Sequence, residues 1–231
     1  MALPILETPT YELILPSTNK KVKYRPFLVK EYKILLTSVE ADANEISRIV
    51  TELVDNCTFN KLDIEKLAHF DVEYLFLNIR AKSISETADI VINCECGTKI
   101  DYTLEITNLK VVKDEKTSNK VMLTEDVGVV LRYPKFDEML DIRDNANSTR
   151  VVELITACVD AVFTKDDYFD KDSYTNEELS TFISSFTKKQ FDKLEEFFRN
   201  IPKIVQHIEV DCPSCKKHNE VDLEGLQNFF V

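Results

Sequence analysis

The chain of 231 residues is long enough for one large domain or two small domains that pack closely together. Hydrophobic residues make up 44% and charged residues 30% of the sequence, a balance that favours a folded core over general disorder. The net charge of −12 opposes contact with phosphate backbones, so nucleic acid is not expected as the main partner.

The N-terminal segment, residues 1–86, is predicted to form a β-hairpin followed by helices. Strand-like runs over 11–15 and 21–25 flank residues 16–19, which favour a turn. The apolar side chains of Leu13 and Leu15 either offer an edge for a partner strand or fold back onto the core. Apolar residues at helical spacing predict helices over 31–36, 46–54 and 72–83, and a short helix capped by Asp63 that contains Phe70.

The next segment, residues 87–134, is predicted to be β-rich. Strand-like runs over 90–93 and 100–106 flank a turn that holds Cys94 and Cys96. Gly97 follows this pair and can adopt the positive φ that a tight turn requires. Further strands are predicted over 111–112, 121–123 and 127–133, the last two forming a hairpin around Glu125 and Asp126.

The third segment, residues 135–203, is predicted to be helical. Apolar spacing indicates a short amphipathic helix over 136–142 and a largely buried helix over 151–162. Two later helices begin with capping boxes, in which a threonine side chain and a residue three positions on satisfy each other's backbone N–H groups. These boxes are Thr175 with Glu178 and Thr187 with Gln190.

The last segment, residues 204–231, contains a second cysteine pair between strands. Strands over 204–210 and 220–223 flank Cys212 and Cys215. The apolar residues 229–231 at the end of the chain either insert into a partner or fold back onto the core. No internal helical repeat is apparent, although the unit of strand, cysteine pair and strand occurs twice. We therefore expect an α+β fold, mainly helical with several β-hairpins, whose four segments pack as one compact unit.

The two cysteine pairs predict one structural zinc ion. The N-terminus carries no signal-like segment, and no stretch approaches the run of about 18 apolar residues that spans a membrane. A reducing cytosol is therefore expected, in which disulfides are rare. Zinc takes four tetrahedral ligands, commonly two from each of two turns, so Cys94, Cys96, Cys212 and Cys215 are the predicted ligands of a zinc-ribbon-like module.

Two alternatives to this ligand set stay open. The pairs can be unrelated, because the first has only one residue between its cysteines where the more usual spacing has two. His218 can replace one cysteine as a ligand. The other cysteines, Cys57 and Cys158, lie in apolar helical patterns and are predicted to be core residues.

No enzyme signature is present in the sequence. The three glycines are too widely spaced for a phosphate-binding loop, and no zinc-protease or nucleophile-elbow motif can be written. His207 and Glu209 before Cys212 resemble part of a zinc-deaminase motif, but the proline lies inside the cysteine pair instead of before it. A thiol redox site at Cys212 and Cys215 would need a helix N-terminus, whereas a strand turn is predicted here. We expect a protein without enzymatic activity.

Three stretches of the sequence, 22–31, 186–198 and 223–230, resemble the T4-type bacteriophage baseplate hub assembly proteins. The resemblance implies a late protein of a contractile phage tail, acting in the host cytoplasm as a chaperone or as a minor component of the baseplate hub in the virion. It implies other phage baseplate hub or tail proteins as partners, and no nucleic acid, membrane or small-molecule substrate. The zinc prediction rests on cysteine spacing alone and is independent of this resemblance.

A zinc-ribbon nucleic-acid-binding regulator is the alternative function. Such a ribbon should carry lysine or arginine around its turns, and Lys99, Lys216 and Lys217 lie there. Acidic residues alternate with these lysines, for example Glu95 and Asp211, so the local charge does not favour phosphate binding.

Overall fold

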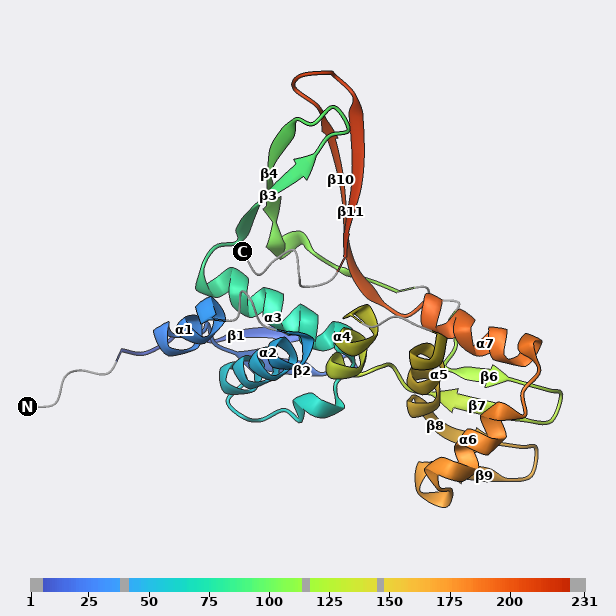
Figure 1. Ribbon diagram of the computed structural model, residues 1–231. Coiled ribbons are helices and arrows are strands. Elements are labelled where there is room, and N and C mark those ends of the chain that lie inside the picture. Colours follow the sequence, from blue (N-terminus) through green and yellow to red (C-terminus); the bar gives the residue numbers. More distant parts are fainter. Residues whose placement is uncertain (1–5, 38–41, 114–116, 145–147, 225–231) are drawn as a thin grey trace, which may run out of the picture. The chain divides into compact units, whose positions relative to one another are not determined.

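The computed structural model describes residues 6–37, 42–113, 117–144 and 148–224. Within these residues the chain forms seven α-helices and four small antiparallel sheets (Figure 1). The mixed α+β class predicted from the sequence is therefore confirmed.

The chain divides into two compact units. Unit 1 comprises Met1–Val112 and Lys203–Val231, and unit 2 comprises Lys113–Pro202. At the boundary, β5 (Val111–Val112) pairs with the start of β10 (Lys203–Asp211), so the chain leaves and re-enters unit 1 at one place. The four segments drawn from the sequence, and their packing as one compact unit, stay a prediction.

Unit 1 begins with the predicted hairpin and a group of helices. Strands β1 and β2 pair antiparallel, with Leu13 opposite Val22. Leu13 and Leu15 are buried, so these side chains pack into the core and are not available at a free edge. The elements are β1 (Tyr11–Ile14), β2 (Lys21–Tyr24), α1 (Val29–Thr37), α2 (Ala43–Cys57) and α3 (His69–Ser83).

The short helix expected after Asp63 differs from the prediction. Residues Ile64–Lys66 form one 3-10 turn, and the Asp63 side chain makes no cap hydrogen bond. Phe70 belongs instead to α3, which is buried along most of its length. The side chain of Asp71 on this helix accepts a hydrogen bond of 3.0 Å from the backbone N–H of Ser17, which ties the β1–β2 turn to α3.

Two longer hairpins complete unit 1. Strands β3 (Thr87–Asn93) and β4 (Lys99–Glu105) form one two-stranded sheet. Strand β11 (His218–Glu224) pairs with β10, and β5 pairs along the other edge of β10. The two hairpins belong to separate sheets and lie beside each other in unit 1 (Figure 1).

Unit 2 combines a four-stranded antiparallel sheet, in the order β6-β7-β8-β9, with helices. The helix predicted over 151–162 ends at Ala157, and Val159–Phe163 is a strand, because its alternating apolar residues pair with β7. Both predicted capping boxes are present, at Thr175 and Thr187. The elements are β6 (Lys120–Met122), β7 (Gly128–Leu131), α4 (Phe136–Asp144), α5 (Ser148–Ala157), β8 (Val159–Phe163), β9 (Tyr168–Asp170), α6 (Asn176–Ser184) and α7 (Lys188–Arg199).

Each unit contains the same arginine-centred motif, which sequence inspection did not find. In unit 1, Arg25 follows β2 and its backbone N–H donates to the Cys57 carbonyl oxygen at 2.9 Å, at the end of α2. The Arg25 guanidinium donates to Glu31 Oε1 at 2.9 Å, and Glu31 Oε2 accepts from the Leu28 backbone N–H at 2.8 Å. One arginine thus joins a strand end to two helices.

In unit 2, Arg132 follows β7 and makes the same set of bonds. Its backbone N–H donates to the Cys158 carbonyl oxygen at 2.8 Å, just after α5. Its guanidinium donates twice to Glu138, at 2.9 and 2.6 Å, and Glu138 accepts from the Lys135 backbone N–H at 2.8 Å. The order of hairpin, arginine, helix, helix and cysteine therefore occurs once in each unit.

Candidate metal centre

The first cysteine turn lies between β3 and β4. The backbone N–H of Cys94 donates to the Thr98 carbonyl oxygen at 3.0 Å, and the Gly97 N–H donates back to the Cys94 carbonyl oxygen at 2.9 Å. Gly97 has a φ of +84°, a conformation that residues with a Cβ adopt only at a cost. Glycine directly after Cys96 therefore allows the chain to reverse within a short turn.

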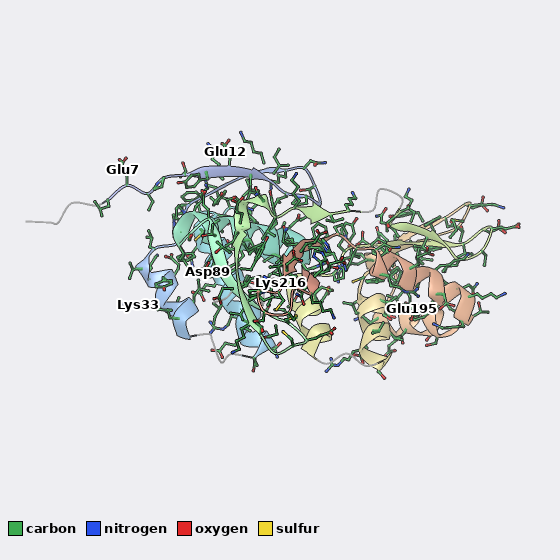
Figure 2. All side chains as sticks on the ribbon, turned by 90° about the horizontal axis from the view of Figure 1, so that it is seen from above. Glu7, Glu12, Lys33, Asp89, Glu195 and Lys216 are labelled. Atoms are coloured by element: carbon green, nitrogen blue, oxygen red, sulfur yellow. The ribbon has the colours of Figure 1, made fainter. Side chains whose placement is uncertain are left out.

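The second cysteine turn lies between β10 and β11 and repeats this pattern with one extra residue. The Cys212 N–H donates to the Lys217 carbonyl oxygen at 2.9 Å, and the Lys216 N–H donates back to Cys212 at 3.0 Å. Lys216 follows Cys215 directly and has a φ of +62° (Lys216 is labelled in Figure 2). In both turns the second cysteine precedes the residue with positive φ, so the different spacings give equivalent turns.

The four sulfur atoms predicted as ligands lie together. Cys94 Sγ is 3.7 Å from Cys215 Sγ, and Cys96 Sγ is 3.6 Å from Cys212 Sγ. All four atoms lie within 4.8 Å of one another. A disulfide bond would need about 2.05 Å, whereas thiolates on a tetrahedral zinc, with Zn–S of about 2.3 Å, lie about 3.8 Å apart. The separations fit a shared metal ion such as zinc, and not disulfides.

The sulfurs differ in their exposure. Cys94 and Cys212 are buried, while Cys96 and Cys215 face solvent. The residue pair Ile92 and Ile100 lies opposite each other on β3 and β4 next to the turn, and both side chains are buried. Two of the four sulfurs thus lie on the buried side of the turns, next to a buried apolar pair.

Ionisation of the cluster is uneven. Hydrogen bonds with the side chain and the backbone of Thr98, together with those to the neighbouring thiols, lower the pKa of Cys96 to about 6. At Cys215 a backbone hydrogen bond from Lys217 lowers the pKa, but the thiols of Cys96 and Cys212 raise it more, to about 11. Four adjacent thiolates repel one another, so full ionisation requires a cation among them.

One ion pair also joins the two cysteine turns. Lys217 Nζ lies 2.5 Å from Glu95 Oε2, and both side chains are exposed. Such exposed pairs contribute little stability. The pair nevertheless neutralises the positive charge of Lys217, which weakens the attraction of this side chain for a phosphate group.

The remaining residues named from the sequence lie elsewhere. His218 Nδ1 lies 2.9 Å from Asp211 Oδ1, outside the group of four sulfurs. Cys57 and Cys158 are fully buried, and burial raises the pKa of each thiol to about 12, so the prediction that they are core residues is confirmed. Residues 229–231 lie outside the described residues.

Comparison with known families gives one result that covers nearly the whole sequence. A family model described as T4 bacteriophage base plate protein matches residues 8–231. The chain belongs to the T4 bacteriophage base plate protein family. This membership confirms the resemblance seen in the sequence at the level of the baseplate, and implies interaction with other baseplate proteins. No curated protein and no solved structure gives a significant match.

No α-helix among the described residues is both long and apolar enough to cross a membrane.

Proposed function

We propose that this baseplate-family protein is a non-enzymatic tail assembly protein that acts through protein–protein contacts at the baseplate hub. It works in the host cytoplasm, either as a chaperone that leaves or as a minor hub component that stays in the virion. The observation that carries the proposal is the family match over residues 8–231. Assembly factors need a stable surface for their partners.

A structural zinc ion stabilises this surface, and its ligands are Cys94, Cys96, Cys212 and Cys215. Four thiolates fill a tetrahedral shell and leave no position for water or substrate, which is typical of structural and not catalytic zinc. The ion cross-links hairpins from separate sheets that are more than one hundred residues apart in the sequence. Its binding free energy therefore adds directly to the stability of unit 1.

Quantitative mass spectrometry tests the assembly role. The protein is measured in purified baseplate intermediates and in finished virions from one infection. A chaperone is present in the intermediates and absent from virions, whereas a hub component is present in both at a fixed ratio to other hub proteins. Absence from both samples would overturn the proposed role.

The alternative, a zinc-ribbon regulator that binds nucleic acid, receives less support. Lys217 is paired with Glu95, and the outer face of the β10–β11 hairpin carries four carboxylates. A phosphate-binding ribbon needs unpaired basic side chains at this position. Salt-sensitive binding to DNA or RNA in a mobility assay would nevertheless return this alternative to first place.

A further inference from the structure

The outer face of the β10–β11 hairpin carries a ladder of histidines and carboxylates. Antiparallel register places His207 opposite Asp222, Glu209 opposite Glu220, and Asp211 opposite His218. Because alternate residues of a strand point to the same face, all six side chains share one face. Each is at least half exposed, between 50% and 74%. We call this set the His–Glu ladder.

Both imidazoles in the ladder are oriented by an aspartate on the neighbouring strand. His207 Nδ1 lies 2.7 Å from Asp222 Oδ1, and His218 Nδ1 lies 2.9 Å from Asp211 Oδ1. An ionised carboxylate only accepts hydrogen bonds, so each Nδ1 carries the proton. The Nε2 atom of each neutral imidazole then keeps its lone pair, as in histidines that bind metals while a carboxylate holds the other nitrogen.

The Nε2 atoms are turned toward the central glutamates. His218 Nε2 lies 4.0 Å from Glu209 Oε2 and 3.8 Å from Glu220 Oε1. His207 Nε2 lies 3.4 Å from the other oxygen of Glu209. Two ligand atoms that each bind one ion at about 2.1 Å lie at most about 4.2 Å apart. Each of the three histidine–glutamate separations is therefore short enough for both atoms to bind one ion.

The two central glutamates repel each other unless a positive charge lies beside them, and both imidazoles are neutral above their pKa values, which the paired aspartates raise. Glu209 and Glu220 are direct cross-strand neighbours, and like charges in that position destabilise a hairpin. The other two cross-strand pairs each join a histidine to an aspartate. When both imidazoles are neutral, the four carboxylates of this face therefore keep an uncompensated negative charge. A divalent ion between the glutamates removes the repulsion and also uses the oriented nitrogens.

We propose that the His–Glu ladder binds one divalent transition-metal ion through His218, Glu209 and Glu220, with His207 beside the second oxygen of Glu209. Asp211 is a positioning residue, because it holds the His218 ring and does not bind the ion. Mixed imidazole and carboxylate ligands suit zinc, nickel or cobalt, whereas thiolates select zinc. The ladder is open to water on its exposed side, unlike the four-sulfur cluster.

Calorimetric titration with NiCl₂ tests the proposal on full-length protein that already carries zinc on its cysteines. The wild type is expected to bind one equivalent of Ni²⁺ saturably, and the variants E209Q and H218A are expected to lose this binding. D211N is expected to bind about 10- to 100-fold more weakly, the usual effect of removing a carboxylate that orients a metal-bound histidine. D89N, a carboxylate change on the β3–β4 hairpin (Asp89 is labelled in Figure 2), serves as the control and binds as the wild type does.

Nuclear magnetic resonance locates the ion independently of any variant. Bound Ni²⁺ is paramagnetic and should broaden the amide signals of 207–211 and 218–222 in the wild type, while zinc stays on the protein. The proposal is overturned by non-saturable heat in the wild type, by unchanged binding in both E209Q and H218A, or by displacement of zinc into solution.

Discussion

The backbone N–H of Arg25 donates a hydrogen bond of 2.9 Å to the carbonyl oxygen of Cys57, the last residue of α2. The Arg25 guanidinium simultaneously reaches Glu31 at the start of α1, and both side chains of this pair are almost fully buried. The end of β2, α1 and α2 are therefore fixed relative to one another by one side chain. The equivalent bonds of Arg132 do the same in unit 2.

Removing the buried arginine should destabilise the protein strongly. R25A removes the buried cation beside Glu31 and leaves only the exposed Lys30 ammonium, at 3.4 Å. Loss of a buried ion-pair partner costs about 3–5 kcal/mol of unfolding free energy. R132A should cost less, about 1–3 kcal/mol, because its ion pair with Glu138 is more exposed, at 26% and 21%. Urea unfolding followed by circular dichroism measures both changes.

The control for these variants is R48A, which removes an exposed pair with Glu52 on α2. Its expected cost is within about 0.5 kcal/mol. Equal destabilisation by R25A and R48A would contradict the role given to the buried pair.

Acid should weaken the two arginine-centred motifs. Burial raises the pKa of Glu31 and of Glu138, but the neighbouring arginine and a backbone N–H lower it more, so each net pKa lies below the ordinary value. A carboxyl group with a depressed folded-state pKa stabilises the fold above its unfolded pKa of about 4.3. This contribution is lost as pH falls through the folded-state pKa.

Measuring the free energy of unfolding between pH 7 and pH 3 checks this expectation. The variant E31Q/E138Q should be less stable than the wild type at pH 7, and the difference should shrink as pH falls below about 4.3. A difference that stays constant over the whole range would show that neither carboxylate contributes through its charge.

Each cysteine turn has one residue with positive φ, a lysine in one turn and a glycine in the other. Replacing the lysine by glycine should stabilise the protein, and replacing the glycine by alanine should destabilise it. Lys216, with φ of +62°, occupies a conformation that costs a residue with a Cβ roughly 1–2 kcal/mol. K216G should therefore raise the stability of the zinc-loaded protein by up to about 1 kcal/mol, whereas the β-branched K216V should lower it.

The first turn supplies the matched experiment. Gly97 has φ of +84°, and an added Cβ would meet no atom within 4 Å, so only backbone strain opposes a side chain there. G97A should cost about 1–2 kcal/mol, measured by thermal unfolding with zinc present. A stabilising G97A together with a destabilising K216G would contradict the positive-φ geometry of both turns.

Removing the metal should loosen the two hairpins and spare unit 2. The cysteine turns belong to separate sheets, and their sulfurs and the Lys217–Glu95 pair join them. After chelation, or in C212S, hydrogen exchange should become faster in β3, β4, β10 and β11 and stay unchanged in α6 and α7. S214A in the same turn serves as the control. Uniformly faster exchange throughout the chain, or none, would contradict a local zinc cross-link.

Much of the fold follows from local sequence patterns, and the contacts between distant segments do not. The hairpin before Arg25 and the capping boxes at Thr175 and Thr187 are confirmed, because turn residues and caps act within a few positions. The helix expected to run to Val162 stops at Ala157, because pairing of the next residues with β7 outweighs their helical spacing. Short apolar runs fit either element, and only tertiary contacts decide between them.

The spacing of the cysteines predicts part of the candidate site. Two cysteine pairs at strand turns indicated that Cys94, Cys96, Cys212 and Cys215 meet, and their sulfurs do lie together. Sequence inspection missed the positive φ of Lys216, because nothing in a lysine marks that conformation. It also missed the arginine-centred repeat, since a single Arg–Glu pair six residues apart is a weak signal and the second helix is shorter in unit 2.

X-ray absorption at the zinc edge tests the four-cysteine centre most directly. Protein purified with one zinc per chain should show four sulfur neighbours at about 2.3 Å and no nitrogen or oxygen neighbour. That result would agree with a closed structural ion that holds the two hairpins of a baseplate assembly protein. A shell with three or fewer sulfurs plus nitrogen or oxygen would contradict it, pointing to His218 or to an open, water-bearing site.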